Sequence, residues 1–182
     1  MQPLLESARL VLRPYQASDS SDVKRLAGDR RIADTATAIP HPYPEGAAQA
    51  WIATHAPAFD ASNEITYAVT LRGSGVLVGT VRLLDISPKH SRAEIGYWTG
   101  FEFWGLGYCT EAVCRIIPFA YEHLSTTRIV ARCLARNQAS ARVMEKAGLR
   151  KEGHLLKHVL RNGKYEDMLL YGLALLQRDD EA

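Results

Sequence analysis

The sequence has few of the features that mark membrane, metal-binding or disulfide-rich proteins. It contains no run of about 18 apolar residues, so we do not expect a transmembrane helix. The three cysteines, Cys109, Cys114 and Cys133, cannot all pair within one chain, and they lack the spacing of metal ligands. We therefore predict reduced thiols and no metal site. The N-terminus lacks the basic segment and apolar run of a signal peptide, so we expect a cytoplasmic protein.

Neither positive nor negative charge is in large excess. The formal net charge is +2, and the charged residues are spread along the chain rather than gathered in one block. Binding to nucleic acid or to a membrane surface needs a concentrated basic patch, so we predict neither partner. With 182 residues, 47% hydrophobic and 23% charged, the chain is predicted to form a single domain over residues 1–182.

Two common phosphate-binding motifs are missing, although the chain has a glycine turn of the right kind. A P-loop needs a lysine after its glycines, and a Rossmann fingerprint needs a third glycine and a later acidic residue; neither is present. What is present is a strand-like segment, 92–98, then Gly105 and Gly107, then apolar residues at helical spacing over 112–120. Glycines and a helix N-terminus together bring free N–H groups to an anion. The junction predicts a pyrophosphate site, with a ligand-free tight turn as the alternative.

The rest of the chain predicts an alternation of strands and helices. Periodicity, caps and turn residues favour helices over 18–26, 44–57 and 137–147, while 29–43 reads as a loop with at most a helical turn. A strand, a helix and a strand over 92–134 predict a parallel strand pair, and Asn162-Gly163 predicts a hairpin. Seven segments are expected to be strands: 8–13, 64–71, 76–84, 92–98, 127–134, 149–160 and 165–176.

Three segments together resemble the GNAT N-acetyltransferases, and more narrowly the branch of ribosomal-protein N-terminal acetyltransferases of the RimJ/RimL type. They are the opening segment 7–14, the turn Trp104-Gly105-Leu106-Gly107-Tyr108 with Thr110-Glu111-Ala112, and Asn137-Gln138-Ala139-Ser140 leading to Gly148-Leu149 and Glu152-Gly153. The resemblance covers roughly residues 7 to 176. It implies a single α/β domain with a mixed, splayed, mostly antiparallel sheet of about seven strands flanked by helices.

The resemblance also implies acetyl-CoA as the donor, a primary amine as the acceptor, and a set of CoA-binding residues. The strand end is implied to pair with pantetheine, the glycine turn to hold the pyrophosphate, and the start of the following helix to contact the CoA arm. Because the family is often dimeric, a homodimer is a further implication. The implied cofactor-binding residues are Tyr97, Trp98, Thr99, Trp104, Gly105, Leu106, Gly107, Tyr108, Cys109, Thr110, Asn137 and Ser140.

The chain departs from the family where many members carry a tyrosine that protonates the CoA thiolate. Met144 stands there and has no proton to give, whereas Ser140 lies one helical turn earlier on the same face. The branch has a serine proposed as the acid, so we assign that role to Ser140. The alternative interpretation is that Ser140 is a first-turn residue that only satisfies the backbone at the start of the helix. The general base is predicted to be Glu94 or Glu152. Each has the alternative of a surface ion pair.

We therefore hypothesise direct transfer of acetyl to a protein or peptide N-terminal α-amine in a ternary complex, with a ribosomal or other protein N-terminus as the partner. An α-amine is much closer to neutral at pH 7 than a lysine amine. One alternative acceptor is a small amine, such as an aminoglycoside, a polyamine or an amino-acid derivative. Another alternative is a non-catalytic CoA-binding sensor, which Met144 would favour.

Overall fold

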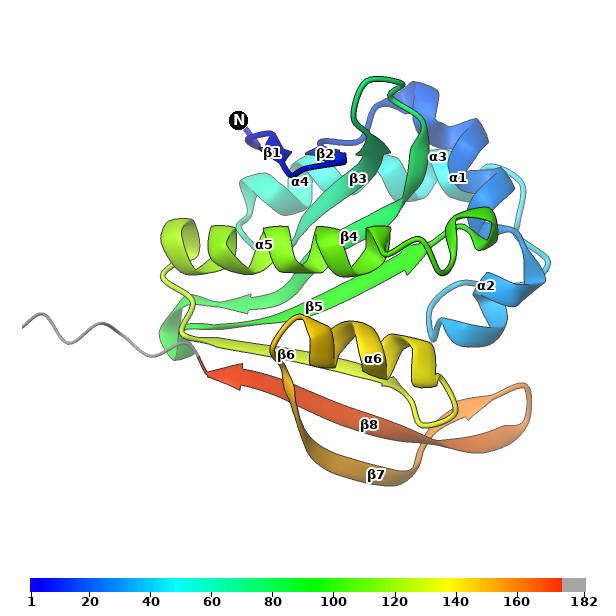
Figure 1. The fold of residues 1–182 in the computed structure, drawn as a ribbon. Helices are drawn as coiled ribbons and strands as arrows, with labels where there is room; N and C mark the ends of the chain where they lie inside the picture. The colour runs from blue at the N-terminus through cyan, green and yellow to red at the C-terminus, as the bar shows by residue number, and fades with distance from the viewer. Residues whose placement is uncertain (175–182) are drawn as a thin grey trace, which may run out of the picture.

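The computed structural model describes residues 1–174 and shows one sheet of eight strands, flanked by helices (Figure 1). The strand order is β1-β2-β3-β4-β5-β6-β8-β7, and every neighbouring pair is antiparallel except β5 and β6. The predicted mixed, mostly antiparallel sheet is confirmed. The strands are β1 (Leu5–Glu6), β2 (Leu10–Arg13), β3 (Ile65–Leu71), β4 (Leu77–Ser87), β5 (Arg92–Thr99), β6 (Arg128–Leu134), β7 (Arg150–Arg161) and β8 (Lys164–Ala174).

Helices cover both faces of the sheet (Figure 1). Alternate residues of β3 show the two sides: Tyr67 packs into the larger core with α5, whereas Ala68 packs into the smaller core with α1 and α3. Within residues 1–174, no helix is both long and apolar enough to cross a membrane. The helices are α1 (Ser20–Ala27), α2 (Arg30–Thr35), α3 (Ala47–Ala53), α4 (His55–Asp60), α5 (Tyr108–Leu124) and α6 (Gln138–Lys146).

Three elements differ from the sequence predictions. The eighth strand, β1, has two residues, too few to show a pattern. The predicted loop 29–43 contains α2, whose start is capped by the Asp29 carboxylate accepting from the Arg31 N–H. The predicted helix 44–57 begins later, because Gly46 takes a left-handed conformation (φ 75°) just before α3. It is also divided at Thr54 into α3 and α4. Residues 175–182 lie outside the described part, as do the end of the strand predicted over 165–176 and the tail of the predicted domain.

The sheet opens between its two parallel strands. β5 and β6 pair only through residues 92–94 and 128–130, yet β5 continues to Thr99 and β6 to Leu134. On its other side β5 stays paired with β4 as far as Thr99. The last residues of β5 therefore have a backbone edge that faces the gap without a strand partner in the described chain, and the Thr99 carbonyl there accepts from the Trp104 indole at 2.7 Å. The predicted splay is present, and it exposes the strand end that was expected to pair with pantetheine.

Candidate active site

A cavity of about 450 Å³ lies at the opening between β5 and β6. Its walls come from the end of β5, the loop into α5, the first turn of α5, one face of α6, the end of β6 and the end of α2. The structure thus brings together eleven of the twelve predicted cofactor-binding residues: Tyr97, Trp98, Thr99, Trp104, Gly105, Gly107, Tyr108, Cys109, Thr110, Asn137 and Ser140. Leu106 does not line the cavity, and its side chain is exposed.

The glycine turn has the geometry expected of an anion site. Gly105 and Gly107 have φ of 77° and 80°, a region that favours glycine. Gly107 is the N-cap of the 17-residue helix α5, and no side chain caps the helix start. The first N–H groups of α5 are therefore free for an anion, and the helix dipole adds positive potential. Glu102, just before the turn, pairs with Arg25 at 2.8 Å instead of facing this site.

The sequence alone missed two basic residues of the site. Arg142 and Lys146 line the cavity from α6, and their spacing places them on one helix face, where both can meet phosphate oxygens. That spacing was the available signal. Ile32 and Thr35 of α2 also line the cavity, but their short helix left no periodic pattern. Cys109 lines it as well; burial raises the pKa of its thiol to about 12, so it stays protonated and is a poor nucleophile.

Ser140 faces the cavity, whereas Met144 does not. The Ser140 N–H donates to the Asn137 side chain at 3.1 Å, so Asn137 caps α6 as predicted. The Ser140 hydroxyl lies 2.9 Å from the Tyr97 hydroxyl. Met144 is fully buried in the core. The position that carries a tyrosine in many GNAT enzymes is thus a packing position here, whereas Ser140, one turn earlier on α6, lines the cavity.

The structure does not bring Glu94 or Glu152 to the cavity. Arg132 binds both carboxylate oxygens of Glu94, at 2.6 and 3.1 Å. Arg128 likewise holds both oxygens of Glu152 and lowers the pKa of that carboxyl. Arg128 is the first residue of β6, at the end opposite the opening. The geometry favours the ion-pair interpretation of both glutamates, and their roles as bases stay predictions.

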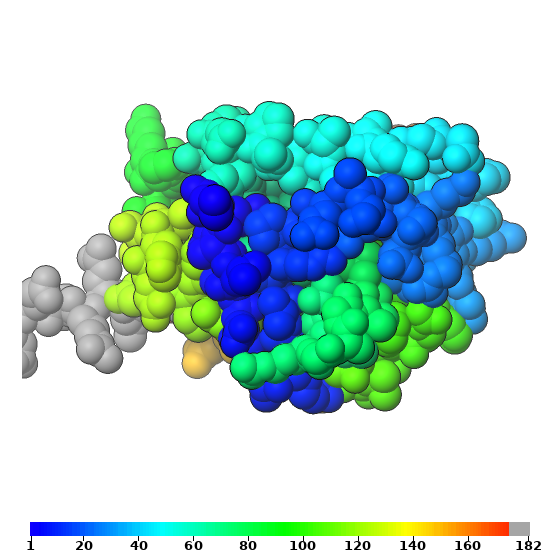
Figure 2. Space-filling model, turned by 90° about the horizontal axis from the view of Figure 1, so that it is seen from above, coloured from blue at the N-terminus to red at the C-terminus, as the bar shows by residue number. Residues whose placement is uncertain are grey.

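Arg9 ties the glycine turn to the start of α5. The N-terminal segment, dark blue in Figure 2, lies beside the β3–β4 turn and α5. The Arg9 side chain donates to Glu111 at 2.7 Å and to the Leu106 carbonyl at 3.0 Å, and its guanidinium lies 4.7 Å from the centre of the Tyr108 ring. Arg9 thereby holds both ends of the turn in place.

Arg9→Met is expected to raise the KM for acetyl-CoA about 5–10-fold and to leave kcat within about twofold. The variant keeps the length of the side chain but loses charge-assisted hydrogen bonds worth about 1–1.5 kcal/mol at this half-exposed position. Initial rates at varied acetyl-CoA concentration measure both constants. Arg150→Met, at an exposed position in β7, is the matched control. An unchanged KM would contradict the role given to Arg9.

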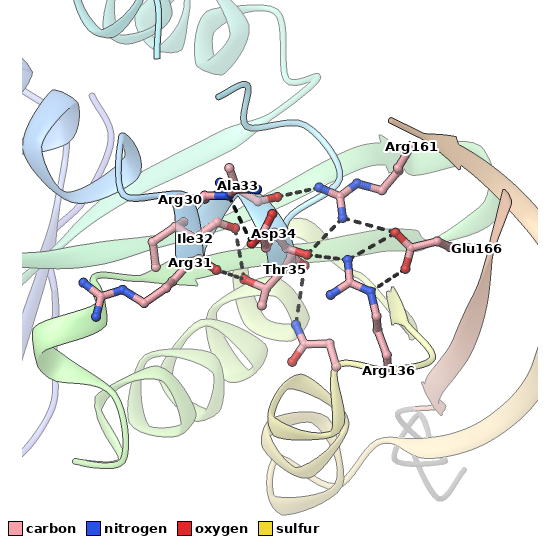
Figure 3. A network of polar contacts seen from close by, with 10 residues as sticks. Arg30, Arg31, Ile32, Ala33, Asp34, Thr35, Arg136, Arg161 and Glu166 are labelled. Atoms are coloured by element: carbon pink, nitrogen blue, oxygen red, sulfur yellow. Dashed lines mark hydrogen bonds and ion pairs between the residues drawn. The ribbon is translucent and has the colours of Figure 1, made fainter. Parts of the chain in front are cut away.

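A polar network holds α2 over the cavity (Figure 3). Arg161 donates to the carbonyl of Asp34 at 3.0 Å, and Arg136 donates to the same carbonyl at 2.6 Å. Glu166 accepts from Arg136 and lies 3.6 Å from Arg161. Two cations at the C-terminal end of a helix also suit its dipole. The network fixes the wall formed by α2.

Glu166→Gln is expected to raise the KM for acetyl-CoA about 2–5-fold, because the two arginines lose the charge that aligns them. The range corresponds to about 0.5–1 kcal/mol, the usual value of a partly exposed ion pair. Glu6→Gln removes a carboxylate paired with Arg72 far from the cavity and is expected to leave the KM unchanged. If both variants behaved alike, the network would not shape the site.

A second cavity, of about 320 Å³, adjoins the first. It is enclosed by α1, the segment 38–43, α3 and the middle of the sheet, and Trp98 lines both cavities. Most of its lining is apolar or aromatic, and Arg82 is its one charged lining residue within the described chain. A group bound in this second cavity would therefore approach the end of β5 from the face opposite α5.

Fold and site together define a CoA-dependent acyltransferase, and sequence comparison agrees. Residues 9–150 match the family described as "Acetyltransferase (GNAT) domain", so the chain belongs to the GNAT acetyltransferases. It is accordingly an acetyl-CoA-dependent N-acyltransferase. The uncharacterized N-acetyltransferase YoaA of Bacillus subtilis (strain 168) is 29% identical over 182 residues, which cover 95% of this chain and 97% of YoaA.

Relatives with assigned substrates match about half of the chain. The ribosomal-protein-serine acetyltransferase of Escherichia coli (strain K12) is 30% identical over 52% of this chain and 53% of its own length. The spermidine N(1)-acetyltransferase of Vibrio cholerae is 27% identical over 50% and 53%, respectively. Among solved structures, RimL, the ribosomal L7/L12 α-N-protein acetyltransferase in complex with coenzyme A, superposes with a TM-score of 0.87 at 19% identity, covering 95% and 98% of the two chains. That likeness confirms the fold.

Proposed function

We propose that this protein transfers acetyl from acetyl-CoA to the N-terminal α-amine of a protein or peptide whose first residues are neutral or acidic. The charge of the two cavities carries the proposal. Among the described residues that line them, the charged side chains are Arg82, Arg142 and Lys146, and none is a carboxylate. Polyamines and aminoglycosides carry several positive charges, and the described lining of the second cavity offers them Arg82 and no carboxylate. A terminal segment with a single amine needs no such carboxylate.

The protonation of the acceptor supports the same choice. No described carboxylate lines the cavities to take a proton from a charged amine. At pH 7 roughly a tenth of an α-amine with a pKa near 8 is already neutral, against roughly one part in 2,500 of a lysine amine. Where no lining carboxylate takes the proton, the neutral, reactive fraction of an α-amine at pH 7 exceeds that of a lysine amine by more than two orders of magnitude.

The described residues supply the other requirements of transfer. Free N–H groups at the end of β5 and the start of α5 suit the donor, with Arg142 and Lys146 beside its phosphates. We assign polarisation of the thioester carbonyl to a backbone N–H at the end of β5, where Thr99 faces the gap. The amine enters through the second cavity, and the thiolate leaves beside Ser140. Burial raises the pKa of the Cys109 thiol to about 12, which makes it a poor nucleophile and supports direct attack in a ternary complex.

The acceptor is tested by following thiol release from acetyl-CoA. The panel contains one peptide with its N-terminus either free or acetylated. It also contains versions of this peptide that begin with Ala, Ser or Met, and versions with Asp or Lys at the second and third positions. Spermidine and an aminoglycoside complete the panel. We expect turnover only with free termini, and a higher kcat/KM for the Asp peptides. Spermidine is the second candidate, on account of the Vibrio relative. Turnover with spermidine alone would overturn the proposal, and thermal stabilisation by acetyl-CoA without any turnover would favour the CoA-binding sensor.

A further inference from the structure

The hydroxyl of Ser140 has a close partner on the opposite wall of the cavity. The Tyr97 hydroxyl lies 2.9 Å from Ser140 Oγ and 3.1 Å from the Ser140 carbonyl oxygen. Tyr97 belongs to β5 and Ser140 to the first turn of α6, so the contact bridges two elements on either side of the opening. Cys133 of β6 also lines the cavity.

The arrangement of donors and acceptors restricts where the Ser140 proton can point. Each hydroxyl has one proton to donate and can accept others. The Tyr97 phenol has one proton. When it goes to the Ser140 carbonyl, the phenol oxygen accepts from Ser140; when it goes to Ser140 Oγ, the proton of Ser140 must point away from Tyr97. Ser140 lines the cavity, so the free direction includes the cavity itself. The pair can thus present one directed O–H donor at the wall, whereas a lone serine would rotate among three positions.

Burial makes Tyr97 a stable donor rather than an acid. Loss of hydration raises the pKa of the Tyr97 phenol well above its usual range, the nearby Cys109 raises it further, and the hydrogen bond with Ser140 lowers it only in part. A raised pKa means that the protonated form persists, so Tyr97 keeps its proton through neutral and mildly alkaline pH. Its hydrogen bond to Ser140 is therefore available throughout that range.

We propose that Tyr97 is a positioning residue that turns the Ser140 O–H toward the sulfur of the departing CoA. The inference rests on the proposed acetyl transfer and gives the Tyr97 side chain a role beyond its predicted backbone pairing. As the C–S bond breaks, its electron pair stays on sulfur, and Ser140 stabilises the thiolate by one hydrogen bond. The nitrogen loses one proton as the amide forms, and that proton ends on the thiolate. Neither hydroxyl changes its net protonation.

The direct test is the ionisation of the CoA thiol in the binary complex. Ultraviolet absorbance reports the thiolate, and the complex with desulfo-CoA provides the baseline that removes the protein's own tyrosines and cysteines. Without Tyr97 the Ser140 O–H is no longer held toward sulfur, so Tyr97→Phe is expected to raise the pKa of the bound thiol by about half a pH unit, the roughly threefold loss that free rotation among three positions gives. Ser140→Ala removes the donor and should raise that pKa more, by about one pH unit. The double variant should match Ser140→Ala, because both residues act through one hydrogen bond.

Kinetics provide the second readout. Tyr97→Phe is expected to lower kcat about threefold, the loss expected when the Ser140 O–H is free to take three positions. The KM for acetyl-CoA should change little, because the ring that packs against the core is retained. Tyr121→Phe, at an exposed position of α5, is the matched control and should match the wild type. A wild-type thiol pKa in Tyr97→Phe would overturn the proposal, and so would additive effects of the two substitutions. The pKa of the bound CoA thiol is measured without an amine acceptor. It therefore tests the role of Tyr97 independently of the acceptor panel.

Discussion

Ser140→Ala is expected to lower kcat about 10²-fold and to change the KM for acetyl-CoA less than about twofold. Hydrogen-bond donors or acids that act on a leaving group typically contribute about 10²–10⁴-fold, and Ser140, the predicted acid, lines the cavity. The backbone N–H of Ser140 caps α6 through Asn137, and alanine keeps that bond. The fold should therefore be preserved while transfer is slowed.

Steady-state kinetics with the best acceptor of the panel measure this effect. Ser21→Ala, exposed on α1 outside both cavities, is the control and should leave both constants unchanged. Thermal unfolding of the two variants should agree with the wild type to within a few degrees. A wild-type kcat in Ser140→Ala would remove Ser140 from the mechanism and favour its alternative interpretation as a residue of the helix start.

Gly79→Ala is expected to weaken the fold and the binding of acetyl-CoA together. A Cβ at Gly79 would lie 2.3 Å from the Trp98 carbonyl oxygen and 2.9 Å from Thr99 Cα, so β4 and the end of β5 would be forced apart. Overpacking of this kind costs about 1–3 kcal/mol, which lowers Tm by about 3–10 °C in a chain of this size. The displaced segment is the one predicted to pair with pantetheine, so we expect KM to rise more than about tenfold.

Gly153→Ala is the matched control in the same sheet. Its Cβ would meet the Leu170 side chain at 3.6 Å, an ordinary contact, and its effect on unfolding is expected to stay within about 0.5 kcal/mol. Scanning calorimetry and calorimetric titration with CoA measure stability and affinity separately. If Gly79→Ala retained the wild-type Tm and affinity, the close approach of β4 to Trp98 would have no part in forming the site.

Contiguous motifs were enough to predict most of the fold and the wall of the cavity. The glycine turn with the start of α5 is written in one stretch, and so is the hairpin at Asn162-Gly163, where both residues have positive φ between β7 and β8. Local backbone preferences decide such elements. By contrast, α2 has six residues, too few for a helical period, and its place over the cavity depends on arginines more than 100 residues away.

The sequence could not show which side chains from distant segments contact one another. Glu94 and Glu152 read equally well as bases or as ion-paired residues. Only the alignment of β6 in the sheet reveals that Arg132 and Arg128 hold them. The contact between Tyr97 and Ser140 likewise joins residues 43 positions apart. Such contacts follow from tertiary packing, which no local propensity encodes.

The most direct test of the account is the position of the acetyl group on a peptide that offers both kinds of amine. The peptide has a free serine terminus, aspartates at its second and third positions, and one lysine near its end. Fragmentation mass spectrometry after reaction with acetyl-CoA locates the modification. We predict acetyl on the α-amine alone, formed more slowly by the Ser140→Ala variant. Acetyl on the lysine, with the terminus left free, would contradict the proposed acceptor.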